Sequence, residues 1–193
     1  MKAVTFKRMI DGTRDDFELL EREGSAYFAA VPDRILGVLE TMGQAFVGYQ
    51  VSSLEHLLQT ATRAERDDAD EEMIVGALLH DFGDVFAPHN HPEFAAAMLR
   101  PYVREEVHWI VRHHGIFQFF YYGHHRDINP NMREQYRNNT YYEACVAFCE
   151  RWDQMSFDPS YESYSLDHFA PMVRRIFARK PFDPAVIRAH AST

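Results

Sequence analysis

The sequence predicts an all-α protein, a helical bundle, and three observations lead to this prediction. Apolar residues recur with the three- and four-residue spacing of amphipathic helices along most of the chain. No segment alternates apolar and polar residues over any useful length, as a half-buried strand would. Glycine and proline are sparse, nine of each in 193 residues, and most fall between the periodic segments. We expect a single domain over residues 1–193.

The first two predicted helices are recognised by the residues at their ends. Residues 13–24 open with Thr13 and several acidic side chains, which suit a helix start, and they close at a glycine. Residues 33–43 follow Pro32, a residue favoured at the first helical position, and also stop at a glycine. These start and stop signals predict two short helices.

The next two predicted helices follow one another directly. In residues 51–67, Ser52 and Glu55 have the Ser-x-x-Glu spacing of a capping box, in which each side chain binds the other residue's backbone N–H. Residues 70–83 begin with acidic side chains and become apolar through Leu79. Both segments therefore read as helices with a buried stripe.

Helical spacing continues in residues 91–103, 104–115, 140–155 and 165–180. Between them, residues 115–140 form the longest stretch predicted to be irregular, and such a connection is usually functional or mobile.

An aromatic run at residues 117–122 lies in that irregular stretch. It either packs onto the bundle or forms a lid or wall over a site, and both interpretations stay open.

Composition and charge exclude several functions. A net charge of −9, without a dense cluster of Lys and Arg, argues against nucleic-acid binding. Cys145 and Cys149 cannot form a disulfide framework, so we expect reduced core thiols. The chain start has no apolar signal region, and no segment reaches the roughly 18 apolar residues of a membrane span. We therefore expect a soluble, cytoplasmic protein that acts on a small molecule, with a homodimer left open.

One stretch, GALLHDFGDVFAPHNHPEF at residues 76–94, concentrates histidine and aspartate directly after an apolar run. His80 and Asp81 are adjacent there, and His91 follows. Imidazole and carboxylate groups are costly to bury without partners, and a metal ion suits both. The stretch therefore predicts part of a metal site.

Further candidate ligands lie at helix ends or beside apolar residues. His56 lies in the first turn of its capped helix, His113 and His114 close another, and Asp153 lies late in a third. Each histidine alone is more often a satisfied core or surface residue than a ligand. Together, these side chains can converge at one end of a bundle.

The segment SLEHLLQTATRAERDDADEEMIVGALLHDFGD places His56 on one predicted helix and the adjacent His80 and Asp81 at the end of the next, with Asp153 far downstream. This pattern resembles the HD superfamily of metal-dependent enzymes over residues 50–157. The resemblance implies that these four residues are metal ligands in a helical fold.

The resemblance also implies two metal ions. Members with two further histidines, matched here by His91 and His114, form a dinuclear branch in which Asp81 is expected to bridge the ions. His113 is the alternative to His114. The branch includes myo-inositol oxygenase, the di-iron phosphonate oxygenases and cyclic-dinucleotide phosphodiesterases, whose Gly-Tyr-Pro motif is absent here.

The same ligands support two reaction classes, and their chemistry does not decide between them. With two Fe ions, the resemblance implies an oxygenase that uses O2 to cleave or oxidise a small hydroxylated substrate, including one with an amine or ammonium group. With Mn, Mg, Zn or Ni, the alternative is a phosphohydrolase acting on a phosphomonoester or a nucleotide. We favour the oxygenase. A degenerate binding module is a third class, disfavoured because all six ligand positions are filled.

Asp84, just after the HDFG turn, favours the oxygenase. Inositol oxygenase has a lysine there and the phosphonate oxygenases a histidine, whereas a carboxylate would repel a phosphate. A plain salt-bridged carboxylate is the alternative interpretation. The aromatic run at 117–122 suits an ammonium group through cation–π contact, although Arg112 and Arg126 could serve an anion.

The phosphonate oxygenases carry a tyrosine and a glutamate before the first ligand histidine, and the matching positions here are Phe46 and Tyr49. The tyrosine is displaced and the glutamate is missing, so the substrate need not be a phosphonate. Tyr49 either reaches the metals from the loop before Ser52 or is a buried loop residue bonded to backbone. The candidate catalytic residues are Asp81, Tyr49 and Asp84.

Overall fold

The computed structural model describes residues 3–44 and 48–188, and neither range contains a strand, which confirms the predicted all-α class. The α-helices are α1 (Arg14–Ala29), α2 (Val31–Met42), α3 (Ser53–Arg66), α4 (Glu71–Leu79), α5 (His91–Leu99), α6 (Glu105–Tyr122), α7 (Tyr142–Phe148), α8 (Leu166–Phe177) and α9 (Pro184–Ile187). Shorter elements are the 3-10 turns η1 (Met9–Asp11), η2 (Phe82–Val85), η3 (Gly123–His125) and η4 (Met132–Tyr136), and the π-helical turn η5 (Cys149–Asp153).

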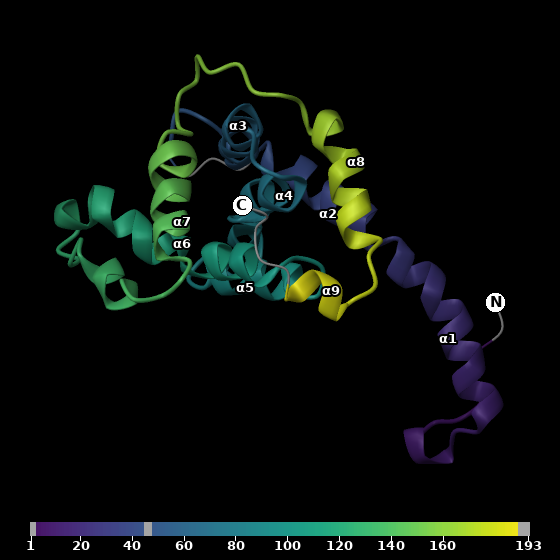
Figure 1. Ribbon diagram of the computed structural model, residues 1–193. Helices are drawn as coiled ribbons and strands as arrows, with labels where there is room; N and C mark the ends of the chain where they lie inside the picture. Colours follow the sequence, from purple (N-terminus) through teal and green to yellow (C-terminus); the bar gives the residue numbers. More distant parts are fainter. Residues whose placement is uncertain (1–2, 45–47, 189–193) are drawn as a thin grey trace.

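Helix α4 lies near the centre of the bundle in Figure 1, and α3 lies above it. α3 packs along α4, and α5 packs along α6. α8 packs against α2 and α4, while α7 packs against α6 and η5 packs against α3. Because α4 has neighbours on several sides, all its residues from Met73 to Leu79 are buried, which explains its continuous apolar run.

The predicted capping box at the start of α3 is present. The Ser52 hydroxyl accepts a hydrogen bond from the Glu55 N–H at 3.1 Å, and the Glu55 carboxylate accepts one from the Ser52 N–H at 2.6 Å. These bonds satisfy two N–H groups that a helix start leaves free. They fix the first turn of α3, which carries His56.

The prediction that residues 115–140 are irregular is wrong at its start, because α6 continues through Gly115 to Tyr122. A Cβ atom at position 115 would lie 3.3 Å from Cγ of Pro92. Glycine therefore lets α6 pass close to the start of α5 instead of ending the helix. Phe117, in the aromatic run, is fully buried and so packs in the core.

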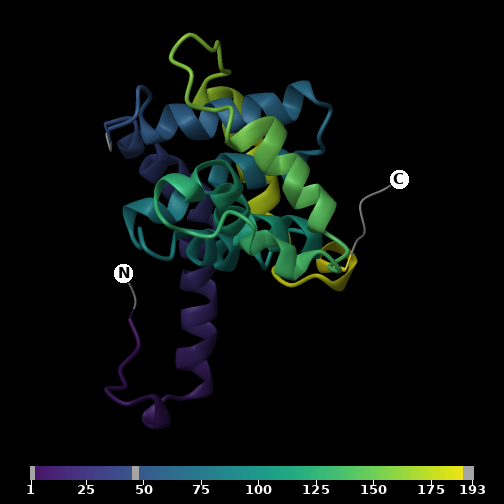
Figure 2. The ribbon, with the colours of Figure 1, turned by 90° about the vertical axis from the view of Figure 1, so that its left-hand side faces the viewer.

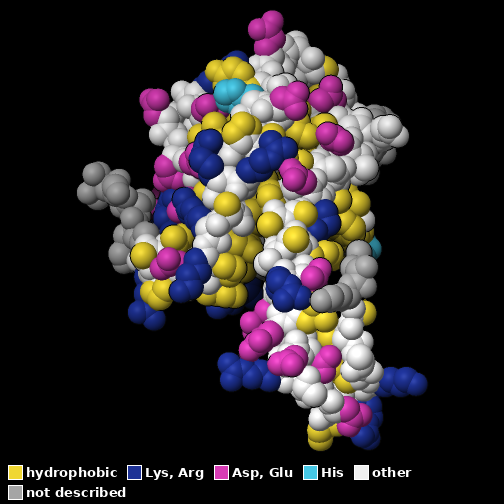
Figure 3. All heavy atoms as spheres, turned by 90° about the vertical axis from the view of Figure 1, so that its right-hand side faces the viewer, with side chains coloured by type: hydrophobic (Ala, Val, Ile, Leu, Met, Phe, Trp, Pro, Cys, Tyr) yellow, Lys and Arg dark blue, Asp and Glu magenta, His cyan; other side chains and the backbone are white. Residues whose placement is uncertain are grey.

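Helix α1 extends away from the bundle and packs against α2 (Figures 1 and 2). None of its residues is buried. Figure 3 shows acidic and hydrophobic side chains side by side on this projecting helix. The helix predicted at residues 13–24 therefore exists, but it lies outside the core.

Two expectations from composition are met by the described residues. Cys145 and Cys149 are buried free thiols. Across residues 3–44 and 48–188, no helix combines the length and the apolar character needed to cross a membrane.

Candidate metal centre

His80 and Asp81 directly follow the buried helix α4, so the fold carries both side chains into the protein interior. Gly83 then allows the start of α5 to come close. A Cβ atom at Gly83 would lie 2.5 Å from the carbonyl oxygen of His91, far inside van der Waals contact. The glycine therefore places His91, the first residue of α5, beside Asp81.

Asp153 is the last residue of the π-helical turn η5, in which the Gln154 N–H donates to the Cys149 carbonyl at 3.0 Å. Such turns contain one extra residue and are frequent at functional sites. η5 packs against α3, and Asp153 lies close to His56.

Of the adjacent histidines on α6, His114 faces the cluster. Its Nε2 atom lies 3.0 Å from Oδ1 of Asp81. The ring of His113 instead stacks on Trp109 at a centroid distance of 4.1 Å, and its Nδ1 atom lies 2.7 Å from the Trp109 carbonyl oxygen.

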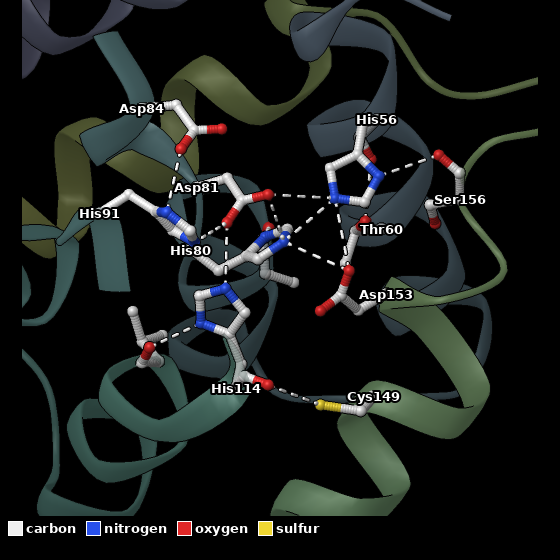
Figure 4. Close-up of polar contacts among 12 residues, drawn as sticks. His56, Thr60, His80, Asp81, Asp84, His91, His114, Cys149, Asp153 and Ser156 are labelled. Carbon is white, nitrogen blue, oxygen red and sulfur yellow. Dashed lines mark hydrogen bonds and ion pairs between the residues drawn. The ribbon is translucent and has the colours of Figure 1, made fainter. Parts of the chain in front are cut away.

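Figure 4 shows four imidazoles around Asp81. In each ring the Nδ1 atom lies within hydrogen-bond distance of a backbone carbonyl oxygen, and the Nε2 atom faces a carboxylate of the cluster. The four Nδ1 contacts are His56 with Ser156 at 2.9 Å, His80 with Ala77 at 2.8 Å, His91 with Pro88 at 3.2 Å and His114 with Val111 at 2.7 Å. An Nδ1–H that donates to a carbonyl leaves the Nε2 lone pair free, which is the usual arrangement of a metal-ligating histidine.

The Asp81 carboxylate divides these imidazoles into two pairs. Its Oδ2 atom lies 3.5 Å from Nε2 of His56 and 3.4 Å from Nε2 of His80. Its Oδ1 atom lies 3.1 Å from Nε2 of His91 and 3.0 Å from Nε2 of His114. Each oxygen of one carboxylate thus faces a different donor group.

Asp153 completes the group around His56 and His80. Its Oδ1 atom lies 3.4 Å and 3.5 Å from their respective Nε2 atoms. Its Oδ2 atom is buried without a hydrogen-bond partner in the described part of the chain. A buried carboxylate oxygen without a partner is costly, and a cation would remove that cost.

The donor spacing fits metal ions. Nitrogen and oxygen ligands that lie about 2.0–2.2 Å from one ion are separated from each other by about 3.0–3.5 Å. The nitrogen-to-oxygen distances given above fall in this range in two groups that share Asp81. The first group contains His56, His80, Asp81 and Asp153, and the second contains Asp81, His91 and His114.

The carboxylates also control protonation of the cluster. Burial alone would lower the pKa of His56, but Asp153 and Asp81 outweigh it and raise that pKa to about 9. Burial is likewise outweighed at His91, where Asp81 and Asp84 raise the pKa to about 10. Burial would raise the pKa of Asp81, yet the neighbouring His80 holds it well below its usual range. Protons and metal ions therefore compete for the same nitrogen lone pairs.

Asp84 lies at the edge of this cluster. Its Oδ1 atom is 3.0 Å from Nδ1 of His91, the ring nitrogen that does not face Asp81, so Asp84 shares this nitrogen with the Pro88 carbonyl. Its side chain is also partly exposed to the adjoining cavity. Asp84 thus combines the salt-bridged role and the pocket-lining role that the sequence leaves open.

A cavity of about 400 Å³ opens beside the cluster. No Lys or Arg contributes to its described lining, and both Arg112 and Arg126 lie outside it. Its lining residues are Tyr49, Val51, Ser52, Ser53, His56, Asp81, Asp84, His91, His114, Gly115, Gln118, Tyr121, Tyr122, Asp153, Gln154 and Phe157. The aromatic run therefore has both predicted roles, since Phe117 packs in the core while Tyr121 and Tyr122 line this cavity.

Tyr49 lines the cavity, and its ring packs against a neighbouring aromatic ring. Its ring lies 4.8 Å from that of Phe157, which stacks on His56 at 4.4 Å. Tyr49 is half exposed, so the prediction of a buried loop tyrosine is wrong. Phe46, the other position compared with the phosphonate oxygenases, lies outside the described residues.

Sequence reasoning missed Gln118, Gln154 and Phe157 as cavity residues. Gln118 follows His114 by one helical turn, so the continuation of α6 would have revealed it. Phe157 follows Asp153 outside any helix, and no local signal places its ring on His56.

Comparison with known proteins agrees with this geometry. A protein of Leisingera caerulea described as "[1-hydroxy-2-(trimethylamino)ethyl]phosphonate dioxygenase (glycine-betaine-forming)" is 34% identical over 90 residues, which cover 40% of this chain and 46% of that protein. The chain thus matches about half of the length of this relative. The HD domain family matches residues 53–153, from the first residue of α3 to Asp153. The chain belongs to the HD domain family.

Proposed function

We propose that the protein is a di-iron oxygenase that uses O2 to oxidise or cleave a small hydroxylated molecule carrying an amine or ammonium group. The observation that carries the proposal is a carboxylate, Asp81, whose two oxygens face two separate donor groups at the base of a cavity. The dioxygenase name of the relative supports the oxygenase class.

In this proposal His56, His80 and Asp153 hold one ion, His91 and His114 hold the other, and Asp81 bridges them. Bound iron would supply electrons for reduction of O2 and a Lewis acid for a substrate hydroxyl. The carbonyls that accept from the imidazole Nδ1 atoms keep the rings oriented, and Asp84 does the same for His91.

The cavity lining supports a cationic substrate. Asp84 is the one acidic side chain of the described lining that is not assigned as a metal ligand, and no Lys or Arg is among the described lining residues. The rings of Tyr49, Tyr122 and Phe157 offer faces on which an ammonium group can lie. We assign Asp84 as the carboxylate nearest to that group and Tyr49 as a wall of the substrate site.

The same charges weigh against the phosphohydrolase alternative with Mn, Mg, Zn or Ni. Enzymes of that kind hold phosphate oxygens with Lys or Arg as well as with metal ions. The described lining has no Lys or Arg, and its carboxylate that is not a proposed ligand, Asp84, would repel a phosphate.

Low-temperature EPR of partially reduced protein, with metals quantified in the same sample, tests the proposal. We expect two irons per chain and a coupled mixed-valent signal. Anaerobic iron loading that gives no such signal, together with phosphomonoesterase activity under Mn, Mg, Zn or Ni, would overturn the oxygenase.

Oxygen uptake with matched substrates tests the substrate class. We expect small amino or ammonium alcohols to stimulate uptake more strongly than carboxylate or phosphate compounds of the same size. Equal or stronger stimulation by the anions would remove the cationic assignment and leave the metal assignment intact.

A further inference from the structure

A second cavity of about 400 Å³ lies beside a different face of α6. Four α6 residues line it with i, i+3, i+4 and i+7 spacing, whereas His114 and Gln118 on another face line the metal cavity. The C-terminal end of α5 and the segment around α9 supply the other walls. The lining residues are Arg100, Val103, Glu105, His108, Trp109, Arg112, Phe182, Ile187 and Arg188.

Positive charge is in excess in this second cavity. Three arginines are among its lining residues, against one acidic residue, Glu105. Arg112 has a distant ion pair with Glu93, at 3.5 Å, between two half-exposed side chains. The guanidinium groups of Arg100 and Arg188 have no hydrogen-bond or ion-pair partner within residues 3–44 and 48–188. The excess is local, since the whole chain carries a net charge of −9.

The positive charge of these arginines also affects the pKa of His108. Burial lowers its pKa, and the nearby Arg100 and Arg112 lower it further, to about 4. His108 is therefore neutral at pH 7, so its ring can hydrogen-bond a ligand without adding a further charge.

Apolar and aromatic side chains form the rest of the lining, among them Val103, Trp109, Phe182 and Ile187. Phe182 is anchored because its N–H donates to the Pro101 carbonyl at 2.7 Å. A ligand with an organic body would therefore find more contact here than a bare inorganic anion.

We propose that the second cavity binds a small organic dianion, whose charged oxygens pair with Arg100, Arg112 and Arg188 and whose body rests on Trp109 and Phe182. Arginine suits this role because its planar fork can donate two parallel hydrogen bonds to a carboxylate or a phosphate. The described lining of this cavity shares no residue with that of the metal cavity.

Isothermal titration of the metal-loaded protein with phenyl phosphate and with phenylsuccinate tests the proposal and separates its two chemical sources. We expect at least one probe to bind with a Kd of about 1 mM or tighter at low salt. Binding should weaken with added salt because the arginines are exposed.

The double variant Arg100→Ala/Arg188→Ala should weaken that binding by about tenfold or more. Arg174→Ala is the matched control, since Arg174 is an exposed arginine on α8 that pairs with Asp33. The control should bind like the parent, and thermal unfolding and metal content should be similar in all three proteins. Equal affinity in the double variant and the control would place the anion elsewhere and overturn the proposal, as would the absence of saturable binding.

Discussion

Two cavities of similar volume lie beside different faces of one helix, α6, and their linings have opposite charge. The metal cavity gathers histidines and carboxylates without Lys or Arg in its described lining, whereas the second cavity gathers three arginines. Local side-chain placement, and not the net charge of −9, therefore decides what each cavity can bind. The helical repeat of α6 is sufficient to direct two unlike sets of side chains in two directions.

Replacing Asp81, the proposed bridging carboxylate, should have the largest effect on the metal cavity. Asp81→Ala removes the one group that faces both histidine pairs, so metal content should fall from two ions per chain to about zero. Asp167→Ala, at an exposed position of α8, is the control that should keep both ions. Metal analysis after gel filtration measures the result. An Asp81→Ala protein that retains two ions would contradict the bridging role.

Gly83→Ala should damage the metal cavity and leave the second cavity intact. A Cβ atom there meets the His91 backbone at 2.5 Å, so α5 must move away from Asp81, at a cost of about 1–3 kcal/mol. The expected results are a lower unfolding midpoint and loss of the ion held by His91. Gly37→Ala is the matched control, because no atom lies within 4 Å of its added Cβ. Equal behaviour of the two variants would show that the close approach is not needed.

Changing Asp84 should alter the charge of the metal cavity and leave the second cavity unchanged. Asp84→Asn keeps the size of the side chain but removes the carboxylate that accepts from His91, so metal affinity should fall by about 10–100-fold. Asp84→Lys should raise the affinity for an anionic analogue in the metal cavity. Equilibrium metal titration and analogue binding measure the two effects. An unchanged affinity in both variants would place Asp84 outside the working site.

The two cavities should also respond to pH with opposite sign. The folded-state pKa values of His56 and His91, about 9 and about 10, lie above the ordinary value of 6.5. Their contribution to the stability of metal-free protein is therefore full below pH 6.5 and is lost as pH rises through 9 and 10. Thermal unfolding of chelator-treated protein should show this loss, and metal-loaded protein should not. A flat profile over that range would contradict the pairing with the carboxylates.

His108 should give the opposite dependence, although with a smaller effect. Its folded-state pKa of about 4 lies below 6.5, so the unfolded chain binds this proton more readily. Stability should therefore fall as pH decreases from 6.5 through 4. His108→Gln should reduce this slope in acid unfolding curves and leave the alkaline loss unchanged. If the variant loses stability with decreasing pH as steeply as the parent does, His108 does not cause this loss.

The six ligands were predicted from the resemblance to the HD superfamily and its dinuclear branch. Their positions at helix ends or beside apolar residues indicated only that the side chains could converge. The structure brings all six side chains together, while their roles as ligands remain a prediction. The choice of His114 over His113 rested on one residue of register, and the helix turns only His114 toward Asp81.

The path of the chain after Gly115 was harder to predict. Glycine is usually a helix stop signal, but here tertiary packing over Pro92 keeps the residue inside α6. The second cavity was beyond prediction for a related reason. Phe182 and Arg188 come from a segment without helical periodicity, and they join Arg100 only through tertiary folding.

The π-helical turn that ends at Asp153 makes this site depend on chain length as well as on residue type. An α-helix turns by about 100° per residue, so deleting one residue from 149–152 would restore ordinary helical bonding and swing Asp153 away from His56. Substitution scanning keeps the residue count and cannot expose this dependence. A related chain with a single-residue gap at this turn should therefore lack the contact between Asp153 and His56, even where the aspartate itself is present.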